Sequence, residues 1–205
     1  MDTSVRVKIC GITNEDDARA AVDAGATALG FNFHPRSVRC VAPRVAAVIV
    51  RRLPHTVCPV GVFVDTPREE VVALAREVGL RALQFHGHEP PEYCRAWAYT
   101  VIKAIRVRDR SAPAAAERYD VDFILADAYV EGHPGGTGLR IAPELLDGFD
   151  RTRLILAGGL TAENVAEAVR RIRPFAVDVA SGVESAPGKK DWQLMRSFVA
   201  NVLAA

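Results

Sequence analysis

The sequence contains no long apolar segment. No run approaches the roughly 18 consecutive apolar residues that a transmembrane helix requires. Residues 1–8 include an aspartate and lack the apolar core of a secretion signal. We therefore expect a cytoplasmic protein that does not bind a membrane.

Cysteines are few, and none of them are closely spaced. The chain has no C-x-x-C pair, which argues against a structural zinc site or a disulfide framework. Reduced thiols are the simpler expectation, since cytosolic cysteines are mostly reduced. We predict no metal site from the four cysteines, Cys10, Cys40, Cys58 and Cys94.

Neither sign of charge is in excess. Lysine and arginine number 26 and aspartate and glutamate 25, which gives a net charge of +1. Nucleic-acid binding favours a concentrated positive field, so this balance gives no reason to expect it. The glycine motif of dinucleotide-binding folds, G-x-G-x-x-G, is also absent after the first predicted strand. A small molecule is the expected partner, and the oligomeric state, monomer or homodimer, is left open.

What the chain does contain is a repeated alternation of short apolar runs and helical stretches. Asn14 and Thr161 are suited to capping helices, and Pro43, Pro67 and Pro91 to opening them. Strand–helix repetition with apolar strands predicts a parallel sheet covered by helices. Eight units close a barrel, so residues 1–205 are predicted to form a single-domain eightfold β/α (TIM) barrel. An open doubly wound sheet is the alternative. The predicted strands are 5–10, 28–33, 58–64, 81–86, 100–107, 121–127, 153–157 and 176–180.

Alternation within the strands predicts which side chains point into the barrel. Lys8 and Cys10 are expected to face inward, since their neighbours on the first strand are apolar. Asp178 on the last strand is expected to face inward too. Strands 1 and 8 are neighbours in a closed barrel, so Lys8 and Asp178 are predicted to form a buried ion pair. Cys10 and Asp127 end their strands at the C-terminal mouth, where active sites of this fold lie.

Two glycine-containing turns follow the last two strands. Gly158 and Gly159 follow strand 7, and Ser181 and Gly182 follow strand 8. Glycine lets backbone N–H groups approach an anion, and these two loops of β/α barrels often bind phosphate. The pairs therefore predict a phosphorylated small-molecule substrate, although such glycines also serve tight turns.

Several side chains at the mouth are suited to acid–base chemistry and substrate binding. Positive potential from Lys8 and the anion-binding loops is expected to favour the Cys10 thiolate. A partly dry site would let Asp127 donate a proton. Arg36 and Arg39 follow strand 2, where arginine matches a carboxylate bidentately. His86 ends strand 4 and is expected to line the mouth.

These stretches together resemble the phosphoribosylanthranilate isomerase family nearly from end to end. The resemblance implies a barrel of the ribulose-phosphate-binding type. It also implies an aldose–ketose isomerase of tryptophan and hence aromatic amino-acid biosynthesis. The reaction would be an Amadori rearrangement of N-(5-phosphoribosyl)anthranilate to 1-(2-carboxyphenylamino)-1-deoxyribulose 5-phosphate, without metal or organic cofactor. The matching stretches are KICGIT (8–13), GF (30–31), HPRSVR (34–39), GVFV (61–64), QFHG (84–87), Asp127, GGTG (135–138), LAGGLT (156–161), VDVASGVE (177–184) and PGKKD (187–191).

The resemblance also assigns roles to individual residues. It makes Cys10 the general base, Asp127 the general acid and Arg39 the group that holds the anthranilate carboxylate. The remaining implied substrate-binding residues are His86 and the phosphate-loop residues Gly158, Gly159, Ser181 and Gly182.

Three other functions are alternatives for a barrel with these features. The histidine-pathway phosphoribosyl-formimino isomerase performs the same rearrangement, but its family has an aspartate where Cys10 stands and needs a second phosphate site. Indole-glycerol-phosphate synthase would need a lysine acid. A non-catalytic phosphate-binding barrel would be expected to have lost Cys10 or Asp127, and both are present.

Overall fold

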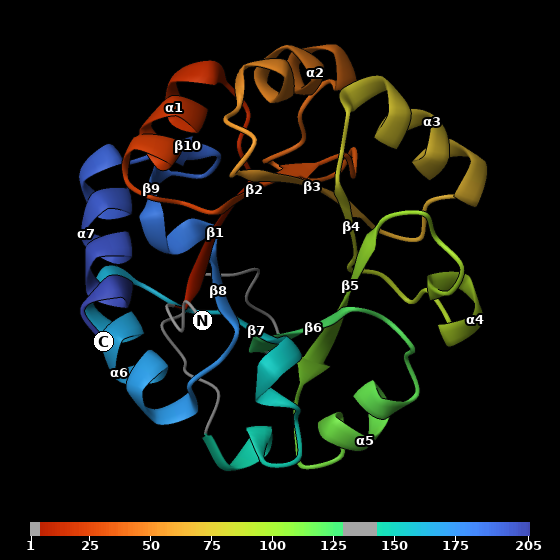
Figure 1. Ribbon diagram of the computed structural model, residues 1–205, viewed down its shortest axis with the longest axis vertical. Coiled ribbons are helices and arrows are strands. Elements are labelled where there is room, and N and C mark those ends of the chain that lie inside the picture. Colours follow the sequence, from red (N-terminus) through yellow and green to blue (C-terminus); the bar gives the residue numbers. More distant parts are fainter. Residues whose placement is uncertain (1–4, 129–142) are drawn as a thin grey trace.

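Eight parallel strands close into a barrel in chain order, with β8 paired to β1 (Figure 1). The computed structural model describes residues 5–128 and 143–205. The closed ring confirms the predicted barrel, and the alternative of an open sheet is wrong. The strands are β1 Arg6–Cys10, β2 Ala28–Asn32, β3 Cys58–Phe63, β4 Ala82–Phe85, β5 Thr100–Val107, β6 Phe123–Ala128, β7 Leu154–Ala157 and β8 Ala176–Val179.

Helices form an outer ring around the strands (Figure 1). Short 3-10 turns η1 (Pro143–Leu146) and η2 (Arg151–Arg153) precede β7, and η3 (Ser181–Val183) follows β8. A two-stranded hairpin of β9 (Glu184–Ala186) and β10 (Lys189–Lys190) lies beside the barrel. The helices are α1 Glu15–Asp23, α2 Pro43–Arg52, α3 Arg68–Val78, α4 Pro91–Cys94, α5 Ala112–Glu117, α6 Ala162–Ile172 and α7 Trp192–Leu203.

Local sequence signals set several helix ends. The Asn14 side chain caps α1 by accepting a hydrogen bond from the backbone N–H of Asp17. Thr161 and Asn164 form a reciprocal capping box at the start of α6. Gly79 ends α3 with φ of 79°, a left-handed conformation that glycine adopts without strain. The predicted capping by Asn14 and Thr161 is thus confirmed.

The alternation of side chains along β1 is as predicted. Val7 and Ile9 are buried against the helices, whereas Lys8 is buried inside the barrel. Lys8 Nζ donates a hydrogen bond to Asp178 Oδ1 at 2.8 Å, and the two residues pair in the β1–β8 register. The predicted buried ion pair is therefore confirmed.

Two apolar clusters build the core. A larger one fills the space between the strands and the helices. A smaller one lies within the ring and includes Val60, Ile102, Leu125 and Ile155. The packed interior leaves the strand ends to carry polar groups, as in other barrels of this kind. Among the residues that the structure describes, no helix is both long and apolar enough to cross a membrane.

Candidate active site

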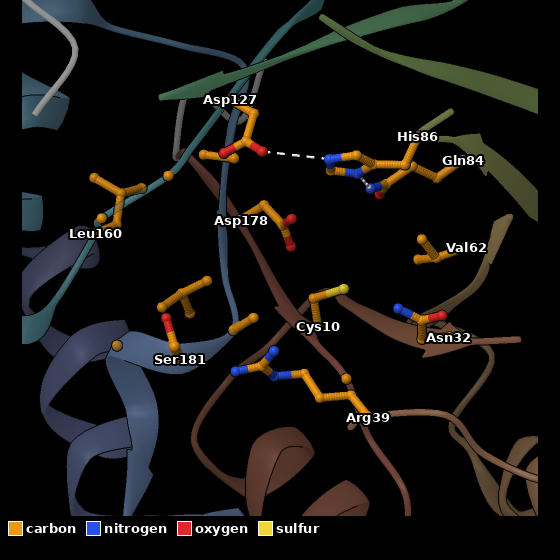
Figure 2. A pocket seen from close by; sticks show the side chains of 17 residues that line it. Cys10, Asn32, Arg39, Val62, Gln84, His86, Asp127, Leu160, Asp178 and Ser181 are labelled. Atoms are coloured by element: carbon orange, nitrogen blue, oxygen red, sulfur yellow. Dashed lines mark hydrogen bonds and ion pairs between the residues drawn. The ribbon is translucent and has the colours of Figure 1, made fainter. Parts of the chain in front are cut away.

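A cavity of about 230 Å³ opens at the carboxyl ends of the strands (Figure 2). Residues of β1, β2, β3, β4, β6, β7 and β8 line it, together with residues of the segments that follow these strands. The residues predicted for the site from sequence all line it: Cys10, Arg39, His86, Asp127, Gly158, Gly159, Ser181 and Gly182. Its other lining residues are Gly11, Asn32, Val62, Gln84, Ala157, Leu160, Asp178, Val179 and Ala180.

Cys10 and Asp127 enter the cavity from different walls. Figure 2 shows the thiol of Cys10 and the carboxyl of Asp127 both directed inward, with Asp178 between them. Cys10 is the last residue of β1, and Asp127 lies one residue before the end of β6. The geometry places a potential base and a potential acid around one space.

The electrostatic surroundings of Cys10 differ from the expectation. Burial raises the pKa of the Cys10 thiol, and the charge of Asp178 raises it further. The charge of Lys8 and a hydrogen bond from it lower the pKa, and that charge acts more strongly than the charge of Asp178, but burial is the largest effect. Lys8 therefore favours the thiolate, as predicted, but burial outweighs it and the pKa of the thiol is raised overall. The ammonium is paired with Asp178, and desolvation dominates at this depth.

Asp127 is the last of three polar side chains that are connected in series. Gln84 Nε2 donates a hydrogen bond to His86 Nδ1 at 3.0 Å, so the ring carries its hydrogen on Nε2. His86 Nε2 then faces Asp127 Oδ2 at 3.3 Å, as the dashed lines in Figure 2 mark. Gln84 is almost fully buried, and the side chains of His86 and Asp127 are each a little over a quarter exposed. These two contacts hold the Asp127 carboxyl in one orientation.

Arg39 projects into the cavity from the segment after β2, but it already has a carboxylate partner. Its Nε and Nη2 donate to the two oxygens of Glu184, each at 2.7 Å. The Glu184 hydrogen bond raises the pKa of the Arg39 guanidinium, so this group stays charged. Arg36, the other arginine considered from sequence, is exposed and does not line the cavity.

The two glycine-containing segments touch one another. A Cβ added to Gly182 would lie 1.9 Å from the carbonyl oxygen of Leu160, which only glycine permits. Gly158 and Gly159 have φ of 83° and 65°, so both adopt the left-handed conformation. These turns line the cavity close to the N-terminus of α6, and helix N-termini and glycine-rich turns favour anions.

One motif of the resemblance cannot be placed, and the described residues offer no metal site. The GGTG motif of residues 135–138, which contributed to the resemblance, lies outside the described residues. Within the described ranges, no group of three or more His, Cys, Asp or Glu side chains is placed to hold a metal ion.

Sequence reasoning missed four polar residues around the cavity. Asn32 and Gln84 line it, Glu184 accepts hydrogen bonds from Arg39, and Lys190 donates one to Glu184. Strand alternation contained the signal for Gln84, because it shares the inward side of β4 with His86. The β9–β10 contact with Arg39 has no comparable local signal.

Comparisons with known proteins identify the family of this chain. The model of the N-(5'-phosphoribosyl)anthranilate isomerase family matches residues 7–201. The chain belongs to that family. N-(5'-phosphoribosyl)anthranilate isomerase of Desulforudis audaxviator is 50% identical over 94% of this chain and 95% of its own length.

Solved structures of the family share the architecture. Phosphoribosyl anthranilate isomerase from Thermotoga maritima superposes with a TM-score of 0.91 at 42% identity, over 98% of this chain and all of its own. A second isomerase structure, in complex with reduced 1-(o-carboxyphenylamino)-1-deoxyribulose 5-phosphate, has a TM-score of 0.87 at 42% identity, with the same coverage. The barrel is thus shared with an isomerase whose structure was solved in complex with a phosphorylated ligand.

Proposed function

We propose that this chain isomerises N-(5'-phosphoribosyl)anthranilate to 1-(2-carboxyphenylamino)-1-deoxyribulose 5-phosphate, a step of tryptophan biosynthesis. The observation that carries the proposal is the pairing of a thiol and a carboxyl, Cys10 and Asp127, around one cavity beside two glycine turns. Membership of the isomerase family supports the same reaction. The enzyme is then an aldose–ketose isomerase that needs no organic cofactor.

The substrate is oriented by its two anionic ends, the sugar phosphate and the anthranilate carboxylate. The sugar phosphate binds the backbone N–H groups around Gly158, Gly159, Ser181 and Gly182, where the left-handed turns and the α6 N-terminus favour an anion. The anthranilate carboxylate binds Arg39. Holding both ends fixes the ribose between Cys10 and Asp127, and such positioning supplies much of a catalytic advantage.

Acid catalysis opens the sugar ring. Asp127 donates its proton to the furanose oxygen as the bond from that oxygen to C1′ breaks, which leaves a hydroxyl on C4′. The nitrogen lone pair forms the C1′=N⁺ iminium. His86 keeps the Asp127 carboxyl directed into the cavity during this step. A positioned acid of this kind typically contributes about 10²–10⁴-fold to the rate.

Base catalysis completes the rearrangement. Cys10 removes the proton from C2′, and the electron pair of that bond neutralises the iminium to give an enolamine. Tautomerisation then places a proton on C1′ and forms the C2′ ketone, so hydrogen moves from C2′ to C1′ with no external oxidant. The thiol is protonated at rest because burial raises its pKa. The adjacent iminium charge lowers that pKa, so the thiol first loses its proton to water in the open cavity, and the resulting thiolate then takes the proton from C2′.

The direct test is turnover of the named substrate. Phosphoribosylanthranilate, generated enzymatically, loses its fluorescence as it is consumed, so the purified protein should accelerate the decay. The Cys10→Ser variant should bind the product analogue with little change while kcat falls by several orders of magnitude. Near-wild-type turnover by that variant, or no turnover by the unaltered protein, overturns the proposal.

The remaining expectations from sequence stay predictions. They are the cytoplasmic location, the lack of nucleic-acid partners, the single domain and the roles of individual site residues.

A further inference from the structure

Glu184 grips one edge of the Arg39 guanidinium. A guanidinium presents its five N–H groups on fixed edges, and Glu184 takes the edge formed by Nε and Nη2 with two bonds of 2.7 Å. The side chain of Glu184 is only 4% exposed, whereas that of Arg39 is 24% exposed. Within the part of the chain that the structure describes, the edge formed by Nη1 and Nη2 remains for a second carboxylate.

Lys190 holds Glu184 in turn. Its Nζ donates to Glu184 Oε1 at 2.9 Å and to the carbonyl oxygen of Ala180 at 3.0 Å, and its side chain is fully buried. Burial alone would raise the pKa of Glu184, but hydrogen bonds from Arg39 and Lys190 lower it below its ordinary value. Glu184 is therefore ionised, and it is shared between two cations.

The charges of this cluster leave one positive charge for a ligand. An isolated Arg39–Glu184 pair would be neutral, and an incoming carboxylate would meet the negative Glu184 beside it. With Lys190 the cluster sums to +1 from two cations and one anion. Burial lowers the pKa of Lys190, but the hydrogen bond and charge of Glu184 oppose that shift.

The hairpin that carries Glu184 and Lys190 is fastened to α1. The carboxylate of the buried Asp17 accepts hydrogen bonds from the Lys190 backbone N–H at 3.4 Å and from Trp192 Nε1 at 3.0 Å. The Asp191 N–H donates to the carbonyl of Val183 at 2.9 Å. The position of Glu184 is thus set by the fold rather than by Arg39.

We propose that Glu184 and Lys190 are positioning residues that orient Arg39, so that its free end selects substrates bearing a carboxylate on the aromatic ring. The inference rests on the proposed function, in which Arg39 holds that carboxylate. Glu184 fixes the angle of the guanidinium, and Lys190 both anchors Glu184 and offsets its charge. Neither Glu184 nor Lys190 is among the residues that line the cavity.

The test compares two ligands that differ only in that carboxylate. One is reduced 1-(o-carboxyphenylamino)-1-deoxyribulose 5-phosphate, and the other is its phenylamino analogue without the carboxylate. Binding of each is measured by calorimetry to the unaltered protein and to Glu184→Gln, Lys190→Met and Arg39→Ala. Ser185→Ala is the matched control, because Ser185 is an exposed hairpin residue beside Glu184.

Orientation and net charge predict opposite results for Glu184→Gln. This variant raises the cluster charge to +2, so attraction by charge alone would tighten binding of the carboxylate ligand. Orientation predicts weakening by roughly tenfold, because glutamine offers one acceptor in place of two. Binding of the analogue should change by less than about twofold. Tighter binding of the carboxylate ligand by Glu184→Gln overturns the inference.

A double variant keeps the test valid if a single variant folds poorly. Glu184→Gln with Lys190→Met removes both buried charges and keeps the cluster at +1, so it should lose the same preference with a normal melting temperature. Equal weakening of both ligands would indicate a merely structural role and would refute the inference.

Arg39→Ala separates the two proposals. If this variant shows no loss of preference, the role of Arg39 itself fails, whereas a loss confined to Arg39→Ala refutes only the roles of Glu184 and Lys190.

Discussion

The ammonium of Lys8 and the carboxylate of Asp178 lie 2.8 Å apart and join the first strand of the barrel to the last. Both residues are buried, with exposed fractions of 3% and 8%. Burial alone would lower the pKa of Lys8, but the charge of Asp178 raises it above its ordinary value. Lys8 is therefore held in its charged form beside Asp178, which lines the cavity.

Removing one member of this pair should be far worse than removing both. Lys8→Met leaves Asp178 buried without its partner and should lower the free energy of unfolding by about 3–5 kcal/mol. Lys8→Met combined with Asp178→Leu should recover most of that loss. Urea unfolding measures both values. Equal destabilisation by the single and double variants would show that the charge pairing is not what matters.

The reactivity of Cys10 should depend on pH in the direction set by burial. Its raised pKa keeps the thiol protonated at neutral pH, so iodoacetamide should modify it slowly there. Modification should accelerate only as pH rises beyond the ordinary thiol range near 8.5. Peptide mass spectrometry follows each cysteine separately, with the exposed Cys40 as an internal reference. Faster labelling of Cys10 than of Cys40 at pH 7 would contradict a raised pKa for the Cys10 thiol.

His86→Asn should impair turnover more than binding. The substitution removes the hydrogen bond to Asp127 Oδ2, so the acid loses its orientation while the phosphate turns are untouched. We expect kcat to fall by roughly tenfold or more, with KM changed less than about threefold. Steady-state kinetics give both values. A rise in KM at constant kcat would instead make His86 a residue that binds substrate equally in the ground and transition states.

Gly182→Ala should separate the two segments that flank the predicted phosphate site. Its methyl group would overlap the carbonyl oxygen of Leu160, since the added Cβ lies only 1.9 Å from it. The turns must move apart, so affinity for inorganic phosphate should fall by roughly tenfold, or about 1.4 kcal/mol. Calorimetric titration provides the measurement, and circular dichroism checks that the barrel remains folded. Unchanged phosphate affinity would place the phosphate elsewhere.

Predictions from sequence succeeded where a short-range pattern determines position. The period of two along β1 places Lys8 and Cys10 inside the ring, and closure then brings Asp178 beside Lys8. Strand ends place Asp127 and His86 at the mouth in the same way. The whole list of predicted site residues lines one cavity because a parallel barrel gathers every strand end on one face.

The features that could not be predicted from sequence depend on how deeply a side chain is buried and on contacts between residues far apart in the chain. The pKa of Cys10 is a balance between burial and neighbouring charges, and no local pattern gives the depth of a thiol. Glu184 and Arg39 are 145 positions apart, so their pairing follows from how the hairpin packs rather than from spacing. The helix pattern expected between β6 and β7 also differs, since the described residues there form only the 3-10 turns η1 and η2.

Pairing of β8 with β1 gives the enzyme a late step of assembly. Cys10 emerges early from the ribosome. The carboxylates that bond to Lys8 and Arg39, and the second of the two anion-binding turns, all come from residues 178–190. A nascent chain that has folded its first six or seven units still lacks these groups. Enzyme activity should therefore appear only when the ring is sealed, which makes turnover a sensitive reporter of complete folding during refolding or translation.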